Sequence, residues 1–389
     1  MTLPRLLDSY ESKSIDDAII MCRDLVEDLD YPTVKKWRDN GGKVVGHFQV
    51  YFPEEIVHAA GLLPFKVHGS NTEARQGESH FGFYLCSILK TSLEIALGGQ
   101  VTLDMFVSHP ICDSARNLAA VFGRNFDYPC EILYLPQNPN SKFAVDYLRG
   151  EYSRLAREVE KIAGREITTE QLKNSIAVFN KNRALMRELY AIKRDTPWLL
   201  AVDEAYVLVA VGGMIPREEH NELLEWAIPR IKERAITPQD RMRLVFSGGF
   251  CEQPPLDLLH VIAQFSYVVD DDLLVGLRYI VDDIVAGDDP FAALAEAYIN
   301  KSSYSPVQHD LDKPKEHMLL KQIKAANAGA AIIAAAKMCE PGLDEQVAYT
   351  KALDDEGIRY FVTEFEERMS NFDSLEIQLE TFIENLLFA

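Results

Sequence analysis

The chain has 389 residues, of which 40 are lysine or arginine and 60 are aspartate or glutamate, so its formal net charge is −20. This length exceeds the size at which one hydrophobic core stops growing, and it predicts two lobes with a cleft between them. The strongly negative field repels phosphate backbones and anionic lipids, which argues against nucleic-acid binding and membrane-surface binding.

The start of the chain and its cysteines indicate the cellular setting. The first residues, MTLPRLLDSYESKS, lack a basic segment followed by an apolar core, and the apolar run at 325–336 is too short to span a bilayer. We therefore expect a cytoplasmic protein with no membrane partner. Six scattered cysteines are too few for a disulfide framework in a chain of this length, and they are interpreted as thiols for ligand chemistry or packing.

The first third of the chain alternates between strand and helix patterns. Residues 1–40 form a helical N-terminal segment that ends at Asn40-Gly41-Gly42. An α/β domain is expected at 41–140. Its predicted strands are 44–50, 65–69, 105–111 and 131–136, and its helices include those that begin near Pro53, Cys86 and Cys112.

The rest of the chain is predicted to repeat this architecture after a helical connector. Residues 141–235 contain no good strand and repeat apolar residues at helical spacing. A second α/β domain at 236–389 has predicted strands at 242–248, 266–272, 328–338 and 358–366. The expected fold class is α/β, with two doubly wound, mainly parallel lobes joined by helices.

Three cysteines are candidates for a shared cofactor site in the interdomain cleft. Cys112 and Cys339 each follow a predicted strand by one residue, at the sheet edge where open parallel sheets bind ligands, and Cys86 opens or lines a neighbouring helix. Thiolates from three segments suit a 4Fe-4S cluster, although core packing is the alternative for each of them. Cys251 also follows a strand, as a fourth ligand or as packing, whereas Cys22 and Cys130 look structural.

The number of protein ligands would decide what a cluster does. Three thiolates leave one iron open for a substrate oxygen or water, which makes a reaction centre, and four thiolates make an electron relay. Proton donors would have to share the cleft. The candidates are Glu55 and His109 first, then Glu54, His47 and His68, with helix capping or ordinary hydrogen bonding as the alternative roles.

Two further patterns bear on function. Asp270, Asp271 and Asp272 end a strand; they are either a solvated strand end or a group that orients substrate or holds Arg278. No phosphate-loop motif occurs, and the glycine pairs lack dinucleotide-fingerprint spacing. Any ATP is therefore expected to be used by another subunit.

Several segments, in this order and spacing, resemble the 2-hydroxyacyl-CoA dehydratase and benzoyl-CoA reductase family. They are FPEEIVHAAGLLPFKVHG, YLCSILKTSLE, HPICDSARNL, SGGFCEQPPLDLL, VVDDDLLVGLRY and KMCEPGLDEQ. CEQPP followed by VVDDD and GLRY is most similar to the smaller cluster-bearing subunit of ATP-dependent benzoyl-CoA reductases. The resemblance assigns Cys86, Cys112 and Cys339 as cluster ligands. Where some related subunits carry a further cysteine before PEE, this chain has His47 and Gln49, a departure that favours an open iron.

The resemblance also implies partners and a reaction. It implies a heterotetrameric enzyme with a homologous cluster-bearing subunit, an ATPase activator and ferredoxin as electron donor, which reduces benzoyl-CoA to a cyclic dienoyl-CoA in anaerobic aromatic degradation. Three alternatives stay open. They are a 2-hydroxyacyl-CoA dehydratase subunit, a non-catalytic electron-relay subunit, and a metal-free two-lobed binder of small molecules.

Overall fold

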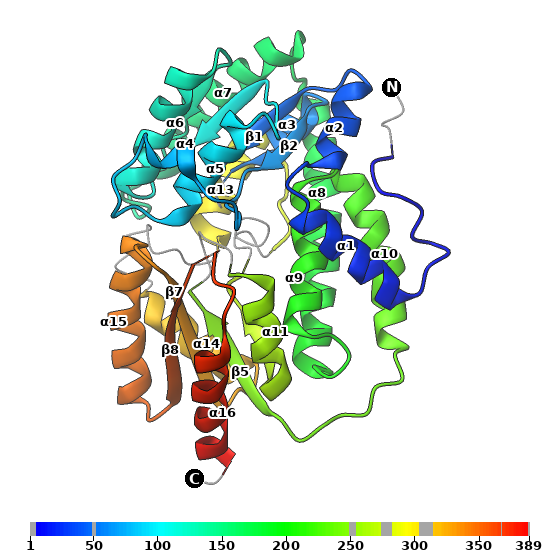
Figure 1. Cartoon of the computed structure of the whole chain (residues 1–389). Helices are drawn as coiled ribbons and strands as arrows, with labels where there is room; N and C mark the ends of the chain where they lie inside the picture. The colour runs from blue at the N-terminus through cyan, green and yellow to red at the C-terminus, as the bar shows by residue number, and fades with distance from the viewer. Residues whose placement is uncertain are drawn as a thin grey trace.

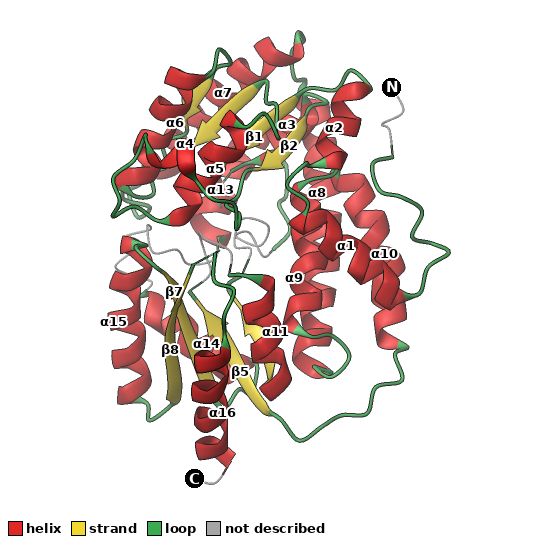
Figure 2. Ribbon diagram, viewed as in Figure 1, coloured by secondary structure: helices red, strands yellow, loops and turns green. Residues whose placement is uncertain are grey.

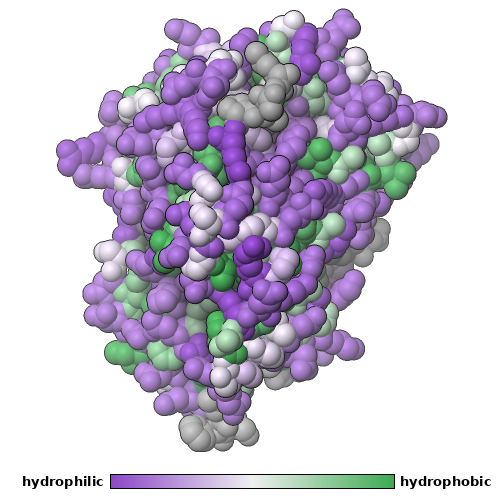
Figure 3. Space-filling model, turned by 90° about the vertical axis from the view of Figure 1, so that its right-hand side faces the viewer, coloured by the Kyte–Doolittle hydropathy of each residue, from purple (hydrophilic) through white to green (hydrophobic). Residues whose placement is uncertain are grey.

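The protein consists of two α/β lobes with the helices of a connector along one side (Figures 1 and 2). The computed structural model describes residues 5–48, 52–248, 254–273, 282–302, 314–366 and 368–387. Across these ranges, no helix combines the length and the apolar character that crossing a membrane requires. The face in Figure 3 is mainly hydrophilic, with small scattered apolar patches, as the high content of acidic residues leads one to expect.

Each lobe contains a sheet of four parallel strands, and the two sheets have the same strand order. The first sheet runs β2-β1-β3-β4 and the second runs β6-β5-β7-β8. The strands are β1 (Val44–His47), β2 (Leu63–Lys66), β3 (Met105–Ser108), β4 (Cys130–Ile132), β5 (Met242–Ser247), β6 (Ser266–Asp271), β7 (Ala330–Ala336) and β8 (Arg359–Phe365). The predicted fold class, two doubly wound parallel lobes, is confirmed.

All eight predicted strands are present, but one is displaced toward the N-terminus. The strand predicted at 65–69 occupies Leu63–Lys66 and contains Pro64. Proline cannot donate a ladder hydrogen bond, so the sequence pattern places the strand after it. In the described part of the chain β2 is an edge strand with β1 as its one neighbour. No strand on its other side needs the backbone N–H that Pro64 lacks.

Helices flank both sheets and fill the connector, where residues 141–235 contain no strand. The N-terminal segment and first lobe carry α1 (Ile15–Glu27), α2 (Pro32–Asp39), α3 (Glu54–Ala59), α4 (Arg75–Glu78), α5 (Ser87–Leu97) and α6 (Asp113–Asn125). The connector holds α7 (Ala144–Ala163), α8 (Thr169–Asp195), α9 (Val202–Ala210), the 3-10 turn η1 (Val211–Gly213) and α10 (Arg217–Lys232). The remaining helices are α11 (Leu256–Phe265), α13 (Pro290–Lys301), α14 (Lys315–Ala325), α15 (Glu340–Asp355) and α16 (Asp373–Leu387).

Two helices join the lobes. Helix α13 follows the first strands of the second lobe in sequence, yet it packs against α7 of the connector, beside the first lobe (Figure 1). Helix α8 contacts α3 on the first lobe and β6 of the second. Its N-terminus is fixed by a capping box in which the Thr168 hydroxyl and the Gln171 side chain each bond the other residue's backbone N–H.

Helix α8 forms a buried ion pair with each lobe. Arg183 pairs with Glu55 of α3, and Lys193 pairs with Asp271 of β6; all four side chains are at most 9% exposed. Tyr190 also donates a hydrogen bond to Asp271 at 2.8 Å. The rise of a helix separates residues 183 and 193 by about 15 Å. The helix therefore connects the two lobes through one buried ion pair at each of these positions.

We expect Lys193→Ala to lower the free energy of unfolding by about 3–5 kcal/mol, because it leaves the Asp271 carboxylate buried without its cation. Lys181→Ala on the same helix is the control, since Lys181 and its partner Glu225 are about half exposed and such pairs contribute about 0–1 kcal/mol. Denaturant titration measures both values. Equal stabilities of the two variants would contradict this role for α8.

Candidate functional site

The strand order of each sheet identifies the edge where a ligand is expected. In the first sheet the order reverses between β1 and β3, and in the second it reverses between β5 and β7. Open α/β sheets bind ligands beyond the carboxyl ends of the strands at such a point. Cys112 follows β3 and Cys339 follows β7, so both lie at these reversal points.

Each of the three candidate cysteines caps the N-terminus of a helix. Cys86 is the N-cap of α5, Cys112 of α6 and Cys339 of α15. The Sγ atom of Cys112 accepts a hydrogen bond from the backbone N–H of Ala115 at 3.3 Å. The first turns of these helices carry unpaired backbone N–H groups and partial positive charge. All three positions therefore favour a negatively charged group.

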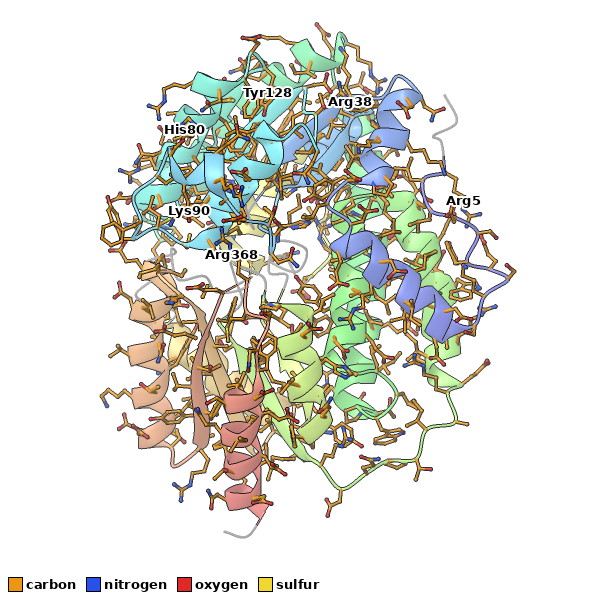
Figure 4. The ribbon with its side chains drawn as sticks, viewed as in Figure 1. Arg5, Arg38, His80, Lys90, Tyr128 and Arg368 are labelled. Carbon is orange, nitrogen blue, oxygen red and sulfur yellow. The ribbon has the colours of Figure 1, made fainter. Side chains whose placement is uncertain are left out.

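The three cysteines line one pocket of about 680 Å³ between the lobes. The first lobe contributes Cys86, Cys112 and residues 80–82, 84 and 85, and the second contributes 338–341, which includes Cys339. His80, which lines the pocket, and Lys90 are labelled on the first lobe in Figure 4. A pocket of this size suits a cofactor or a small organic ligand. The structure thus brings together cysteines that are up to 253 positions apart in the sequence.

The donor set of this pocket consists of three cysteine thiols that come from both lobes. Within the described ranges, no three Cys, His, Asp or Glu side chains are close enough to hold one metal ion. A cluster of four irons takes each protein thiolate on a different iron, so its ligands stand further apart. Cys86, Cys112 and Cys339 could each bind one iron. Cys251 lies outside the described residues.

The two cysteines expected to be structural are away from this pocket. Cys22 is buried in α1, and burial raises the pKa of its thiol to about 12. The pKa of Cys130, at the start of β4, is also raised to about 12 by burial and by Glu131. Burial raises the pKa of Cys112 too, but N–H bonds from Ala115 and Ser114 act in the opposite direction.

Glu54 is held as a buried carboxylate beside His47. Its Oε1 lies 2.9 Å from Nε2 of His47, and its other oxygen accepts a hydrogen bond from Arg217 of α10. Burial alone would raise the pKa of Glu54, but Arg217 and His47 together lower it to about 2. This carboxylate is therefore ionised at neutral pH and accepts the hydrogen bond from Arg217; its role as a proton donor stays a prediction.

Glu55 is held in the same way by a different helix. Its carboxylate pairs with Arg183 of α8, and its backbone carbonyl accepts a hydrogen bond from Ser175 Oγ at 2.8 Å. The side chain is 2% exposed. Arg183 is 128 positions from Glu55, and Arg217 is 163 positions from Glu54. Local sequence patterns do not indicate pairs at such separations.

His109 lies just after β3 and is 1% exposed. Neither of its ring nitrogens has a hydrogen-bond partner in the described part of the chain. Burial, with a smaller contribution from His47, lowers the pKa of His109 to about 3, so the ring is neutral. None of Glu54, Glu55, His47 and His109 lines the cysteine pocket, although Phe48 and Ile111, close to the two histidines in sequence, do.

The remaining candidates lie elsewhere in the cleft. His68 lines a second pocket of about 350 Å³, and its Nδ1 lies 2.9 Å from the Gly69 carbonyl. Arg368, labelled between the lobes in Figure 4, lines the same pocket and donates to the Thr72 carbonyl at 3.2 Å. Asp271 forms the buried ion pair with Lys193. Arg278, which the sequence suggested as a partner of 270–272, lies outside the described residues.

Large aromatic side chains border the cysteine pocket at the surface. Phe83 is 87% exposed and Tyr84 is 62% exposed, three and two positions before Cys86. Lys90 of α5 donates to the Phe83 carbonyl at 3.2 Å, which fixes the loop to the helix. Exposed aromatic residues of this size are typical of protein interfaces.

The comparisons with known proteins agree with the expected family. Residues 49–386 match the family model described as 2-hydroxyglutaryl-CoA dehydratase, D-component. The chain is 29% identical to a benzoyl-CoA reductase subunit of Thauera aromatica, over 96% of this chain and 99% of that protein. It is 27% identical to the lactoyl-CoA dehydratase subunit beta of Anaerotignum propionicum (90% and 93%) and 27% identical to the (R)-2-hydroxyglutaryl-CoA dehydratase subunit beta of Acidaminococcus fermentans (90% and 94%).

A match over most of the chain, together with the two parallel sheets and the pocket between them, confirms the resemblance inferred from the motifs. The chain belongs to the 2-hydroxyacyl-CoA dehydratase and benzoyl-CoA reductase family.

Proposed function

We propose that this chain is the smaller cluster-bearing subunit of an ATP-dependent benzoyl-CoA reductase. The observation that carries the proposal is the set of three helix-capping cysteines, from both lobes, on one pocket. The relative that is 29% identical over nearly its full length is a benzoyl-CoA reductase subunit. The reaction adds two electrons and two protons to the aromatic ring of benzoyl-CoA and yields a cyclic dienoyl-CoA.

A 4Fe-4S cluster held by Cys86, Cys112 and Cys339 would supply electrons near the low end of the cluster range, about −700 mV, which the loss of aromatic resonance demands. The chain's own part is to hold and shield this chemistry. The N-termini of α5, α6 and α15 stabilise the negative charge of the site. His109 and Glu54 do not line the cysteine pocket, and ionised Glu54 fixes the orientation of the buried His47 ring.

The proposed complex includes a homologous cluster-bearing subunit, an ATPase activator and ferredoxin, in the cytoplasm. The relatives are named as subunits, which supports a heteromeric assembly. The exposed pair Phe83 and Tyr84 lies beside the cysteine pocket, where a partner protein would shorten the electron path. ATP is assigned to the activator because this sequence has no phosphate-binding loop motif.

The second candidate function is a subunit of a 2-hydroxyacyl-CoA dehydratase. Dehydratase beta subunits match this chain at 26–27% identity, almost as well as the reductase subunit. In that reaction the one-electron-reduced thioester expels the 2-hydroxyl group instead of accepting a second electron. Both functions use the same three cysteines.

The iron content of the purified chain tests the cluster site. We expect about four irons and four sulfides per chain after anaerobic purification, and loss of most of this iron in Cys86→Ala, Cys112→Ala and Cys339→Ala. Cys130→Ala is the matched control, since Cys130 is also partly buried but does not line the pocket. A colourless wild-type protein, or three variants that keep the iron of the control, would rule out the site.

The reaction is tested with the chain assembled with its partner subunit and activator. With ATP and a low-potential donor, the reductase proposal predicts conversion of benzoyl-CoA to a dienoyl-CoA without loss of water. Reversible elimination of water from 2-hydroxyacyl-CoA thioesters, with benzoyl-CoA unchanged, would instead establish the dehydratase. Mass spectrometry of the thioesters distinguishes the two products.

The proposed interface with the partner protein is tested at Phe83 and Tyr84. We expect the double variant Phe83→Ser with Tyr84→Ser to weaken binding of the homologous subunit at least tenfold, because exposed aromatic anchors contribute about 2 kcal/mol or more at interface centres. Val347→Ser, at another exposed apolar residue (71%), is the control. Unchanged affinity in a calorimetric titration of the double variant would place the interface elsewhere.

A further inference from the structure

A second group of polar side chains lies at the carboxyl edge of the second sheet, outside the cysteine pocket. At its centre is Glu345 of α15, whose side chain is 10% exposed. Its Oε1 lies 2.9 Å from Nζ of Lys315, at the start of α14, and its Oε2 lies 3.2 Å from the Tyr349 hydroxyl. A carboxyl group this deeply buried beside a lysine and a tyrosine is not a solvated surface acid.

Hydrogen bonds connect this glutamate to the ends of two strands. Tyr349 also hydrogen-bonds Ser247, the last residue of β5. Ser247 donates to Asp272, just after β6, at 3.1 Å, and the N–H of Gly248 bonds the same carboxylate at 2.9 Å. The contacts form a continuous line, from Glu345 through Tyr349 and Ser247, that ends at the reversal point of the second sheet.

The backbone at this end of the line is tightly packed. Gly248 has φ +123°, and a Cβ there would stand 2.0 Å from the carbonyl oxygen of Ala334 in β7. Only glycine allows β5 to leave the sheet so close to β7. Ser247 therefore ends β5 at the carboxyl edge of the second sheet, beside β7.

Burial, opposed in part by the neighbouring groups, brings the pKa of Glu345 close to neutrality. Burial raises the pKa of Glu345 to about 7; Asp272 acts in the same direction, and Lys315 and Tyr349 act against it. Glu54, in contrast, has its pKa lowered to about 2 by Arg217 and His47. An acid that exchanges its proton near the working pH is suited to general acid catalysis.

Helix α15 relates this group to the cysteine pocket. Cys339 caps the helix, and Pro341 lines the pocket. Glu345 follows Pro341 by four residues, so it lies one turn further along the same face of the helix. Glu345 and the pocket-lining Pro341 therefore lie on the same helix, one turn apart.

We propose that Glu345 is the proton reservoir for the acyl group reduced in this cleft, with Tyr349 and Ser247 as the relay. This inference rests on the proposed function. In each cycle Glu345 loses one proton to the Tyr349 hydroxyl, which passes one on to Ser247, and Ser247 protonates the acyl group after a low-potential donor has reduced it by one electron. The Glu345 carboxylate that remains is paired with Lys315, and water restores its proton. Glu345 acts through the two hydroxyls and is a positioning residue in this scheme.

Infrared titration of the isolated chain tests the reservoir without any assay of turnover. We expect a carboxylic-acid carbonyl band that disappears as the pH rises through about 7. It should be absent from Glu345→Gln and retained in Asp344→Asn, the matched control at the exposed neighbouring position. Absence of the band in the wild type at pH 6, or its persistence in Glu345→Gln, would overturn the proposal.

The pH dependence of stability gives a second readout. Because the folded pKa lies above the ordinary value of 4.5, the native state holds a proton that the unfolded state releases, so this contribution to stability falls as the pH rises from about 4.5 to about 7. Glu345→Gln should lose this fall in Tm, whereas Asp344→Asn should keep it. Identical pH profiles of the two variants would contradict the assigned titration.

Turnover of the assembled enzyme tests the role. We expect Glu345→Gln to lower kcat about 10²-fold, with KM and iron content unchanged, to lose the pH limb near 7, and to be partly rescued by Glu345→Asp. Full kcat with the wild-type pH profile in Glu345→Gln would overturn the relay. A wild-type complex that turns over no acyl-CoA thioester would overturn the proposed function, and with it the destination of the proton, whatever the infrared result.

Discussion

The arrangement of this molecule depends on the buried ion pairs that α8 makes with each lobe. Arg183 pairs with Glu55 on the first lobe, and Lys193 pairs with Asp271 on the second. Separating a buried ion pair leaves two charges out of water without their partners, which costs free energy. Each pair therefore opposes displacement of its lobe along the helix. The two pairs thereby connect both lobes to one helix, and the cysteine pocket lies between these lobes.

The electrostatics of that cleft come mostly from backbone. The chain carries 20 more acidic than basic residues, yet three helix N-termini converge where the cysteines lie. Peptide dipoles and unpaired N–H groups at those ends supply local positive potential without lysine or arginine ligands. The proposed cluster, with its net negative charge, can therefore be accommodated inside a strongly acidic protein.

Three buried glutamates show how the same side chain takes different roles. Glu54 faces Arg217 and His47 and stays ionised, and Glu55 forms an ion pair with Arg183. Glu345 is also buried, but its lysine is offset by burial and by Asp272, so its pKa lies near 7. The number and sign of neighbouring charges, more than burial itself, separates a structural carboxylate from a proton source.

Local patterns in the sequence were sufficient for much of the architecture. Alternation of apolar strand segments with amphipathic helices predicted eight strands at nearly their observed places, because hydrophobic period and turn residues act within a few positions of one another. The position of Cys112 and Cys339 just after strands was enough to expect them at the cleft, since the carboxyl ends of parallel strands share one edge. The sequence pattern placed β2 too late because it avoided Pro64. Only the sheet order shows that β2 is an edge strand, where proline is tolerated.

The sequence by itself determined the fold class, the family motifs and which cysteines follow strands, because each of these depends on residues that are close together in the chain. Only the tertiary structure decided which carboxylates meet an arginine and which meet a lysine beside a tyrosine. Those partners come from helices far away in the chain, such as Arg217 for Glu54 and Lys315 for Glu345. The free energy of a buried charge depends on everything packed around it, and that environment does not exist until the lobes have closed on the connector.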